Sequence, residues 1–103
     1  MKWAVIGLVL LGLTACQSAE KQMIEDAQAA VAAKLRDPSS AQFRNVRHRV
    51  AETGADIVCG EVNGKNGFGG YAGFQRFIYD AGTTTLEDGD DPGFGLRWVN
   101  TCF

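Results

Sequence analysis

The chain has 103 residues, of which 46% are hydrophobic and 21% are charged. This length suits one small domain and excludes multidomain enzymes and any fold that wraps a large sheet in helices. Ten Lys and Arg stand against twelve Asp and Glu, a net charge of −2. The chain therefore lacks the basic excess of a nucleic-acid-binding protein, and we expect no nucleic-acid partner.

The first sixteen residues have the pattern of an export signal. Met1 and Lys2 give a short positive start, and an eleven-residue apolar run follows over residues 3–13. A helix needs about 20 residues to cross about 30 Å of hydrocarbon, so this run is too short for a membrane span. It has the length of the apolar region of a secretory signal, about 7–15 residues. The tetrapeptide Leu13-Thr14-Ala15-Cys16 closes the run and resembles the bacterial lipobox.

The lipobox resemblance implies that residues 1–15 are removed and that Cys16 carries lipid, with residues 16–20 as a tether. Two or three acyl chains hold a protein stably at a bilayer, because each buried CH₂ contributes about 0.8 kcal/mol and one chain is marginal. Gln17, rather than Asp, after the lipidated cysteine implies transport to the outer membrane of a two-membrane bacterium. We therefore expect a lipid-anchored protein of the cell envelope that faces the periplasm. A plain secretory signal, or a buried helix that ends at a chance cysteine, is the alternative.

Two further cysteines, Cys59 and Cys102, remain if Cys16 is lipidated, and export places both in an oxidising compartment. Two remaining thiols in that compartment are expected to pair. The chain-entropy estimate for such a bridge is about 4 kcal/mol, a large share of a typical total stability of about 5–15 kcal/mol. The alternatives are two separate buried thiols or a metal site. Structural zinc needs four ligands, and only His48 could join the two cysteines.

An amphipathic helix is predicted from Lys21 to Arg36. Its apolar residues recur at helical spacing and form one stripe, namely Ile24, Ala27, Val31 and Leu35. Many alanines raise the helix propensity, and Ser18 is the expected N-cap. Pro38 ends the helix, because the residue before a proline avoids the α region. Asp37 is then expected to cap a short helical turn that begins at Pro38.

After this turn, β-branched and aromatic residues set between Gly, Asn, Asp and Pro favour strands. The expected strands are Gln42–Ala51, Asp56–Val62, Phe74–Tyr79, Gly95–Phe103 and a weaker one at Thr83–Leu86. Period-two alternation places Ile57 and Cys59 on one face of the second strand. It places Leu96, Trp98 and Cys102 on one face of the last strand, so that both cysteines point into one core.

These elements predict an α+β fold, in which an N-terminal amphipathic helix packs on a small, mostly antiparallel sheet of about four strands. Residues 21–103 form the single domain, after a signal peptide at 1–15 and a tether at 16–20. The third strand has apolar residues on both faces, so alternation does not decide its orientation.

The densest feature is a glycine-rich segment over residues 60–76. Its two Asn-Gly steps, Asn63-Gly64 and Asn66-Gly67, predict turns with positive φ and hence a hairpin loop between the second and third strands. The segment departs from the phosphate-binding loop and from the dinucleotide fingerprint, and a hairpin supplies no helix N-terminus. The alternative to a plain turn is a loop that binds a ligand or partner. Its candidate residues are Glu61, Asn63, Lys65, Asn66, Tyr71 and Arg76.

Arg44, Arg47, His48 and Arg49 form a basic cluster in the first strand. In an extended strand these side chains split between two faces, so a single patch is not assured. One interpretation is an edge strand blunted by charge. The other is an anionic surface partner, either lipid head groups or a cell-wall polymer. His48 is the only histidine, and its spacing from Ser and Cys indicates no nucleophile, so no catalytic residue is predicted.

Three strings of the chain, at Asp37–Val46, Val58–Asn63 and Gly69–Phe77, resemble small bacterial lipoproteins and prophage-borne exported proteins of uncharacterised function. The similarity covers residues 34–80. The resemblance implies an exported domain and supplies no reaction. It directs attention to the glycine-rich hairpin as the first place to look for a function.

The predicted function is a non-enzymatic binding or structural module of the cell envelope. Its partners are the membrane, through the lipid anchor, and an envelope protein or cell-wall polymer. The alternatives are an inhibitor or exclusion factor directed at an envelope enzyme or incoming phage, and a small hydrolase that depends on His48. The acidic run over residues 87–92 lacks the ligand pattern of an EF-hand, and we expect neither a metal ion nor a cofactor.

Overall fold

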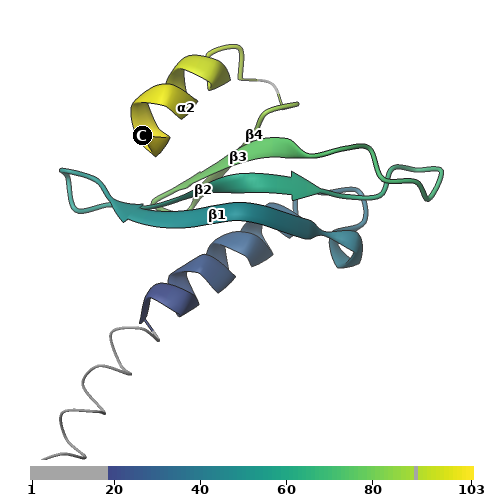
Figure 1. Ribbon diagram of the computed structural model, residues 1–103, viewed down its shortest axis with the longest axis horizontal. Helices are drawn as coiled ribbons and strands as arrows, with labels where there is room; N and C mark the ends of the chain where they lie inside the picture. Colours follow the sequence, from purple (N-terminus) through teal and green to yellow (C-terminus); the bar gives the residue numbers. More distant parts are fainter. Residues whose placement is uncertain (1–18, 90) are drawn as a thin grey trace, which may run out of the picture.

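The computed structural model describes residues 19–89 and 91–103. The predicted signal peptide, the lipidated Cys16 and the N-cap Ser18 lie outside the described residues. Within them the architecture is α+β, a four-stranded antiparallel sheet with one helix on each face (Figure 1). The elements in chain order are a helix over residues 19–32, the 3₁₀ turn η1 (Pro38–Ser40), β1 (Gln42–Val50), β2 (Asp56–Asn63), β3 (Gln75–Asp80), β4 (Thr83–Leu86) and α2 (Phe94–Cys102).

The sheet follows the order of the chain, since β1, β2, β3 and β4 pair in sequence and each pair is antiparallel. Antiparallel neighbours need only hairpin connections, so no crossover is required. The strands predicted at Gln42–Ala51, Asp56–Val62 and Phe74–Tyr79 are confirmed to within one residue at each end. The short strand predicted at Thr83–Leu86 is confirmed with both ends as predicted.

The helix over residues 19–32 is shorter than predicted, because it does not continue to Arg36. Beyond it, the N–H of Leu35 donates to the carbonyl of residue 32 at 3.0 Å, a tightening that is common where a helix ends. Asp37 occupies the N-cap of η1 and Pro38 its first position, as predicted. Because Pro38 disfavours the α region for Asp37, the helix has to end before this residue.

The 19–32 helix packs on one face of the sheet through its predicted apolar stripe. Ala27 and Val31 are fully buried. They form one cluster with three sheet residues, Val58, Val62 and Phe77. The small side chain at position 27 allows the helix backbone to approach the sheet closely.

The last segment is a helix, and the predicted strand over Gly95–Phe103 is wrong. Phe94, Trp98 and Cys102 recur four residues apart and are all buried. Leu96, which strand alternation placed in the core, is 70% exposed. The β-branched and aromatic composition favoured a strand, but β propensity is outweighed by packing. The centre of the second sheet face is apolar, at Ile57, Cys59 and Ile78, and a helix covers it.

A second hydrophobic core lies between α2 and the sheet, and it contains the predicted disulfide, which joins Cys59 of β2 to Cys102 of α2. The sheet contributes Ile57, Cys59 and Ile78, and the buried side of α2 packs on them. The expectation that Ile57 and Cys59 share a core face is therefore confirmed. The bridge fastens a nine-residue helix to an interior strand, and its expected contribution to stability is about 4 kcal/mol.

A bulge in β1 decides where the basic side chains point. Arg44 pairs with position 61 of β2 and Arg47 with position 59, so one extra residue is inserted between them. Asn45, with φ of 54°, takes the left-handed conformation that Asn tolerates at such sites. Arg44, Arg47 and Arg49 therefore all face α2, opposite positions 61, 59 and 57, and His48 faces the 19–32 helix. The four basic side chains are therefore split between two faces, as expected, but the bulge places Arg44 with Arg47 and Arg49, whereas simple alternation would place it with His48.

Candidate functional site

The predicted hairpin loop is confirmed, since residues 64–74 connect β2 to β3 and project beyond the sheet (Figure 1). The assignment of its positive-φ positions is wrong. Positive φ occurs at Gly69 (80°) and Gly73 (107°), and neither Gly64 nor Gly67 adopts it. The Asn-Gly steps therefore shape the loop through their asparagine side chains rather than through their glycines.

Both asparagines brace the loop. The side-chain oxygen of Asn63, a buried residue, accepts a hydrogen bond from the N–H of Gly73 at 3.0 Å. That of Asn66 accepts from the N–H groups of Phe68 (2.9 Å) and Gly70 (3.2 Å). Asn side chains commonly close turns in this way. The shape of the tip is thus set by bonds within the loop itself.

The base of the loop is fastened to η1. The N–H of Lys65 donates to the hydroxyl oxygen of Ser40 at 2.9 Å, and that hydroxyl donates to the carbonyl of Asp37 at 2.7 Å. Gly64 allows close contact here, because a Cβ on it would lie 3.0 Å from a methyl carbon of Leu35. The loop is held at both its base and its tip, which lowers the ordering cost of binding through it.

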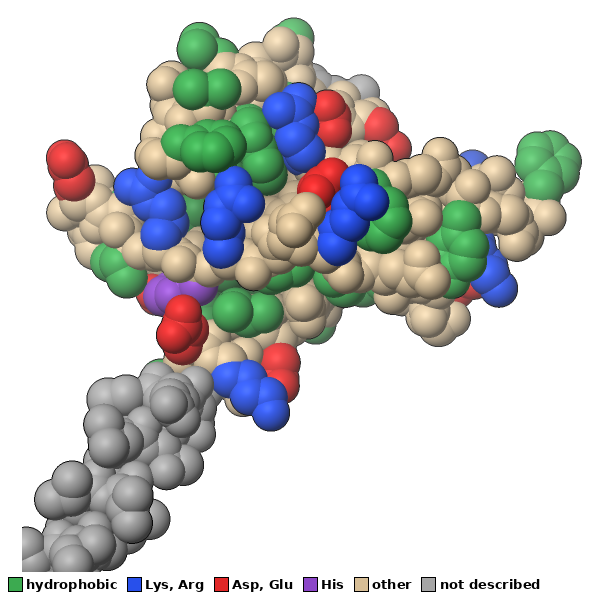
Figure 2. Space-filling model, in the orientation of Figure 1, with side chains coloured by type: hydrophobic (Ala, Val, Ile, Leu, Met, Phe, Trp, Pro, Cys, Tyr) green, Lys and Arg blue, Asp and Glu red, His purple; other side chains and the backbone are tan. Residues whose placement is uncertain are grey.

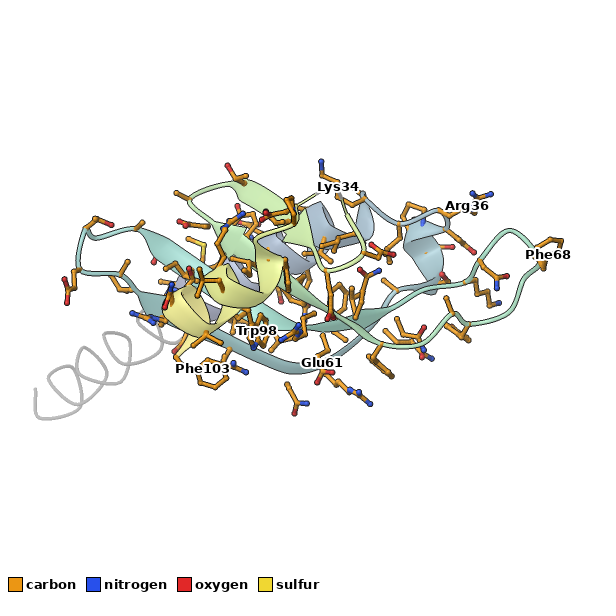
Figure 3. All side chains as sticks on the ribbon, turned by 90° about the horizontal axis from the view of Figure 1, so that it is seen from above. Lys34, Arg36, Glu61, Phe68, Trp98 and Phe103 are labelled. Atoms are coloured by element: carbon orange, nitrogen blue, oxygen red, sulfur yellow. A yellow bond between two sulfur atoms is a disulfide. The ribbon has the colours of Figure 1, made fainter. Side chains whose placement is uncertain are left out.

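The tip of the loop carries an aromatic ring with no cover. Phe68 is 100% exposed and points away from the rest of the molecule (Figure 3). Tyr71, bridged to Lys65 across the loop, is 45% exposed, and the Lys65 ammonium lies 5.8 Å from its ring centroid. Phe68 was not among the predicted binding residues. Its position between Gly67 and Gly69 was the available signal, because a turn does not need a large apolar side chain.

The six residues predicted for the binding loop do not form one site. Four belong to the loop, as its braces or its flank, namely Asn63, Lys65, Asn66 and Tyr71. Glu61 and Arg76 are register partners on β2 and β3, on the sheet face that α2 covers. The predicted site is therefore divided between the loop and the sheet.

The two sheet residues are held in ion pairs. Arg44 donates to one oxygen of Glu61 at 3.1 Å and Asn45 to the other at 2.8 Å, and these bonds lower the pKa of Glu61. Arg76 pairs with Glu87 at 2.7 Å, and the same hydrogen bond lowers the pKa of Glu87 and raises the pKa of Arg76. Both carboxylates are ionised at neutral pH, and each already has its cation.

A cleft of about 210 Å³ lies at the base of the loop, against the segment that follows the 19–32 helix. Three cations line it, Lys34, Arg36 and Lys65. Within the described part of the chain, none of the three is in an ion pair. Asp88 lines the cleft as well and accepts a hydrogen bond from Gln75 at 3.0 Å. Such a site has the charge to take a small anion.

On the other side of the sheet, an open groove of about 440 Å³ runs between β1 and α2. Arg47, Gly60, Trp98 and Phe103 are among its lining residues. The Arg47 guanidinium lies 5.4 Å from the Trp98 ring centroid and 5.3 Å from that of Phe103, within cation–π range. Figure 2 shows Lys and Arg side chains gathered along β1 below α2.

His48 lies on the opposite face, beside the first turn of the 19–32 helix. Its Nε2 is 2.8 Å from the Asp56 carboxylate and its Nδ1 is 3.9 Å from the Glu20 carboxylate. These contacts connect the helix to the sheet. A His–Asp contact also occurs in hydrolytic triads.

Among the described residues, no group of three or more His, Cys, Asp and Glu side chains is placed to hold a metal ion. No helix in that part of the chain has both the length and the apolar character needed to cross a membrane. The chain matches no protein-family model, and no curated protein or solved structure is similar enough to count as a match. Its function is therefore argued from the geometry above.

Proposed function

We propose that the chain is a lipid-anchored, non-enzymatic binding module of the bacterial cell envelope, and that it contacts a protein partner with the tip of its 64–74 loop. The observation that carries this proposal is Phe68, a fully exposed aromatic residue at the end of a hydrogen-bonded loop. Aromatic residues that fill a partner's pocket supply much of the energy of protein interfaces. A loop already held in shape loses little entropy when it binds.

The location in the envelope is supported by two independent features. The Leu13–Cys16 string has the pattern of a lipobox, and the Cys59–Cys102 disulfide is the kind of bond that persists in exported proteins rather than in the cytosol. Gln17 favours the outer membrane. Both core clusters and the disulfide are made by residues after 19, so removal of residues 1–15 leaves them in place.

The same braced loop also suits an inhibitor or exclusion factor, because a rigid protruding loop with an aromatic tip is a shape that can occupy a cleft in another protein. Deletion and overexpression in the native cell separate the two proposals. Altered lysis or altered phage resistance supports the inhibitor, and a module with a structural partner leaves both unchanged.

Photo-crosslinking in intact cells tests the contact. A photoreactive phenylalanine at position 68 is compared with the same residue at position 50, because Val50 is also exposed (58%) but lies at the end of β1. We expect a discrete protein adduct from position 68 alone, lost when the loop is loosened by Asn66→Ala. Adducts of equal yield from both positions, or none from 68, would contradict the proposal.

Phe68→Ala is the matched solution variant. The ring has no cover to lose, so the unfolding free energy is expected to change by less than about 0.5 kcal/mol. Affinity for the crosslinked partner is expected to fall by about tenfold or more, as for a buried aromatic anchor. Equal affinities of Phe68→Ala and wild type would show that the tip is not the contact.

A further inference from the structure

The arginines of the sheet face that α2 covers outnumber the acids beside them. Because of the β1 bulge, Arg44, Arg47 and Arg49 lie on this face together with Arg76 of β3; we call these four the arginine face. Three carboxylates share this face: Glu61 and Glu87 are bonded to Arg44 and Arg76, and Asp80 lies opposite Ile57, in the same row of the sheet as Arg49.

Arg47 and Arg49 carry the surplus charge. Within the described residues neither is in an ion pair. Arg49 donates to the backbone carbonyls of Thr101 (2.8 Å) and Phe103 (3.0 Å), and Arg47 lies over the rings that line the groove. Arg47 contacts only neutral groups, so its charge stays available for an anion, whereas Arg49 is already bonded to main-chain oxygens of residues 101 and 103.

The outer side of α2 adds an apolar stripe to this surface. Leu96 and Val99 are three residues apart and share the outer side of α2, and Phe103 follows the helix directly. They are 70%, 58% and 77% exposed. The helix is thus apolar on its outer side as well as toward the sheet. Phe103 belongs to both features, because it lines the groove beside Arg47.

We propose that the arginine face and the apolar stripe together bind the surface of a membrane that contains anionic phospholipid. The headgroup phosphate lies at the β1–α2 groove against Arg47, which lines it together with the Arg44-bonded Glu61, and Arg49 lies two residues farther along the same face of β1. Leu96, Val99 and Phe103 enter the boundary between headgroups and acyl chains. Arginine on one side and Leu, Val and Phe on the other is the pattern of proteins that lie in a membrane interface. This surface is separate from the 64–74 loop, and the inference does not rest on the loop's function.

Charge complementarity favours a membrane with anionic phospholipid as the partner of this surface. The chain as a whole is acidic, with a net charge of −2, so an anionic bilayer repels it except where the arginine face is turned toward the lipid. A soluble polyanion would use the arginines but would gain nothing from the apolar stripe. A bilayer uses both, because its phosphates and its acyl chains lie within one side chain's length of each other.

Vesicle co-sedimentation tests the proposal with the chain from Cys16 onward, unlipidated and with its disulfide intact. The probes are vesicles of phosphatidylcholine alone and of phosphatidylcholine mixed with phosphatidylglycerol. We expect binding to the mixed vesicles that weakens with added salt. Arg47→Glu with Arg49→Glu should reduce that binding about tenfold or more. Lys34→Glu with Lys65→Glu changes the net charge by the same amount as the arginine pair, but on the loop side of the molecule. This control variant should retain most of the vesicle binding.

A second pair of variants separates lipid from other anions. Leu96→Ser with Val99→Ser keeps the charge and is expected to reduce vesicle binding severalfold, since the buried apolar area is lost. Arg47→Gln removes a single charge and serves where the double reversal disturbs folding, as judged by circular dichroism. Equal binding to both vesicle types, equal losses in the Arg and Lys pairs, or no loss on serine substitution overturns the proposal. Tight binding to polyglutamate without vesicle binding would assign the surface to an acidic protein instead.

Discussion

The two faces of the sheet are covered by helices that are held in different ways. The 19–32 helix is rich in alanine, carries a continuous apolar stripe and buries Ala27 and Val31 completely. The α2 helix has nine residues, a glycine at its second position and no side-chain bond at its N-cap. It is held by a disulfide and by packing on Ile57 and Ile78, and the rings of Phe94 and Trp98 stack within the helix itself, with centroids 6.2 Å apart. A helix with high propensity is visible in the sequence, and one that depends on tertiary contacts is not.

The largest effect is expected on the side of the 19–32 helix, at Phe77. Its side chain is fully buried and meets Phe43 edge-on, with ring centroids 5.9 Å apart. Phe77→Ala is expected to lower the unfolding free energy by about 3–5 kcal/mol, because it leaves a cavity in that core. Urea denaturation measures the loss. The same change at exposed Phe68 is the control, and losses of equal size would contradict the burial pattern.

The disulfide should matter more to α2 than to the opposite helix. Cys59→Ala with Cys102→Ala is expected to cost about 2–5 kcal/mol. Native-state hydrogen exchange is expected to show that the α2 amides lose protection first, since without the bridge this short helix is held by packing on Ile57 and Ile78 and by the hydrogen bonds of Arg49. If the amides of the 19–32 helix lost protection before those of α2, the prediction that the disulfide mainly holds α2 would be wrong.

The smallest expected effect is that of a substitution at Gly95, which tests directly whether residues 94–102 form a helix. Gly95 lies within α2, and a Cβ added there meets no atom within 4 Å. Gly95→Ala is therefore expected to raise the unfolding free energy by about 0.5–1 kcal/mol, the difference between Ala and Gly in a helix. Gly69→Ala, at a φ of 80°, is the contrasting control and should destabilise the protein. A thermal melt that shows no gain for Gly95→Ala would argue against the helix.

The candidate site was only partly predictable. The glycine-rich hairpin followed from its composition, and the brace by Asn63 and Asn66 follows from the tendency of Asn to bond nearby backbone. The division of the predicted residues between the loop and the sheet was implied by the predicted strands, because Asp56–Val62 contains Glu61 and Phe74–Tyr79 contains Arg76. Only the structure shows that Arg44 and Glu87 hold these two side chains in ion pairs. The bulge at Asn45 is a further example, since one inserted residue moves every later side chain of β1 to the other face.

By itself, the sequence determined the elements whose signals are local. These are the alanine-rich helix with its stripe, the strands joined by turns, and the pairing of Cys59 with Cys102, which follows from the number of cysteines that lipidation of Cys16 would leave. Only the tertiary structure decided the state of residues 94–102, because their β-branched and aromatic composition favoured a strand. The deciding term was the apolar patch of Ile57, Cys59 and Ile78 on the second face of the sheet: a helix with Phe94, Trp98 and Cys102 four residues apart covers it, and brings the second sulfur to the first.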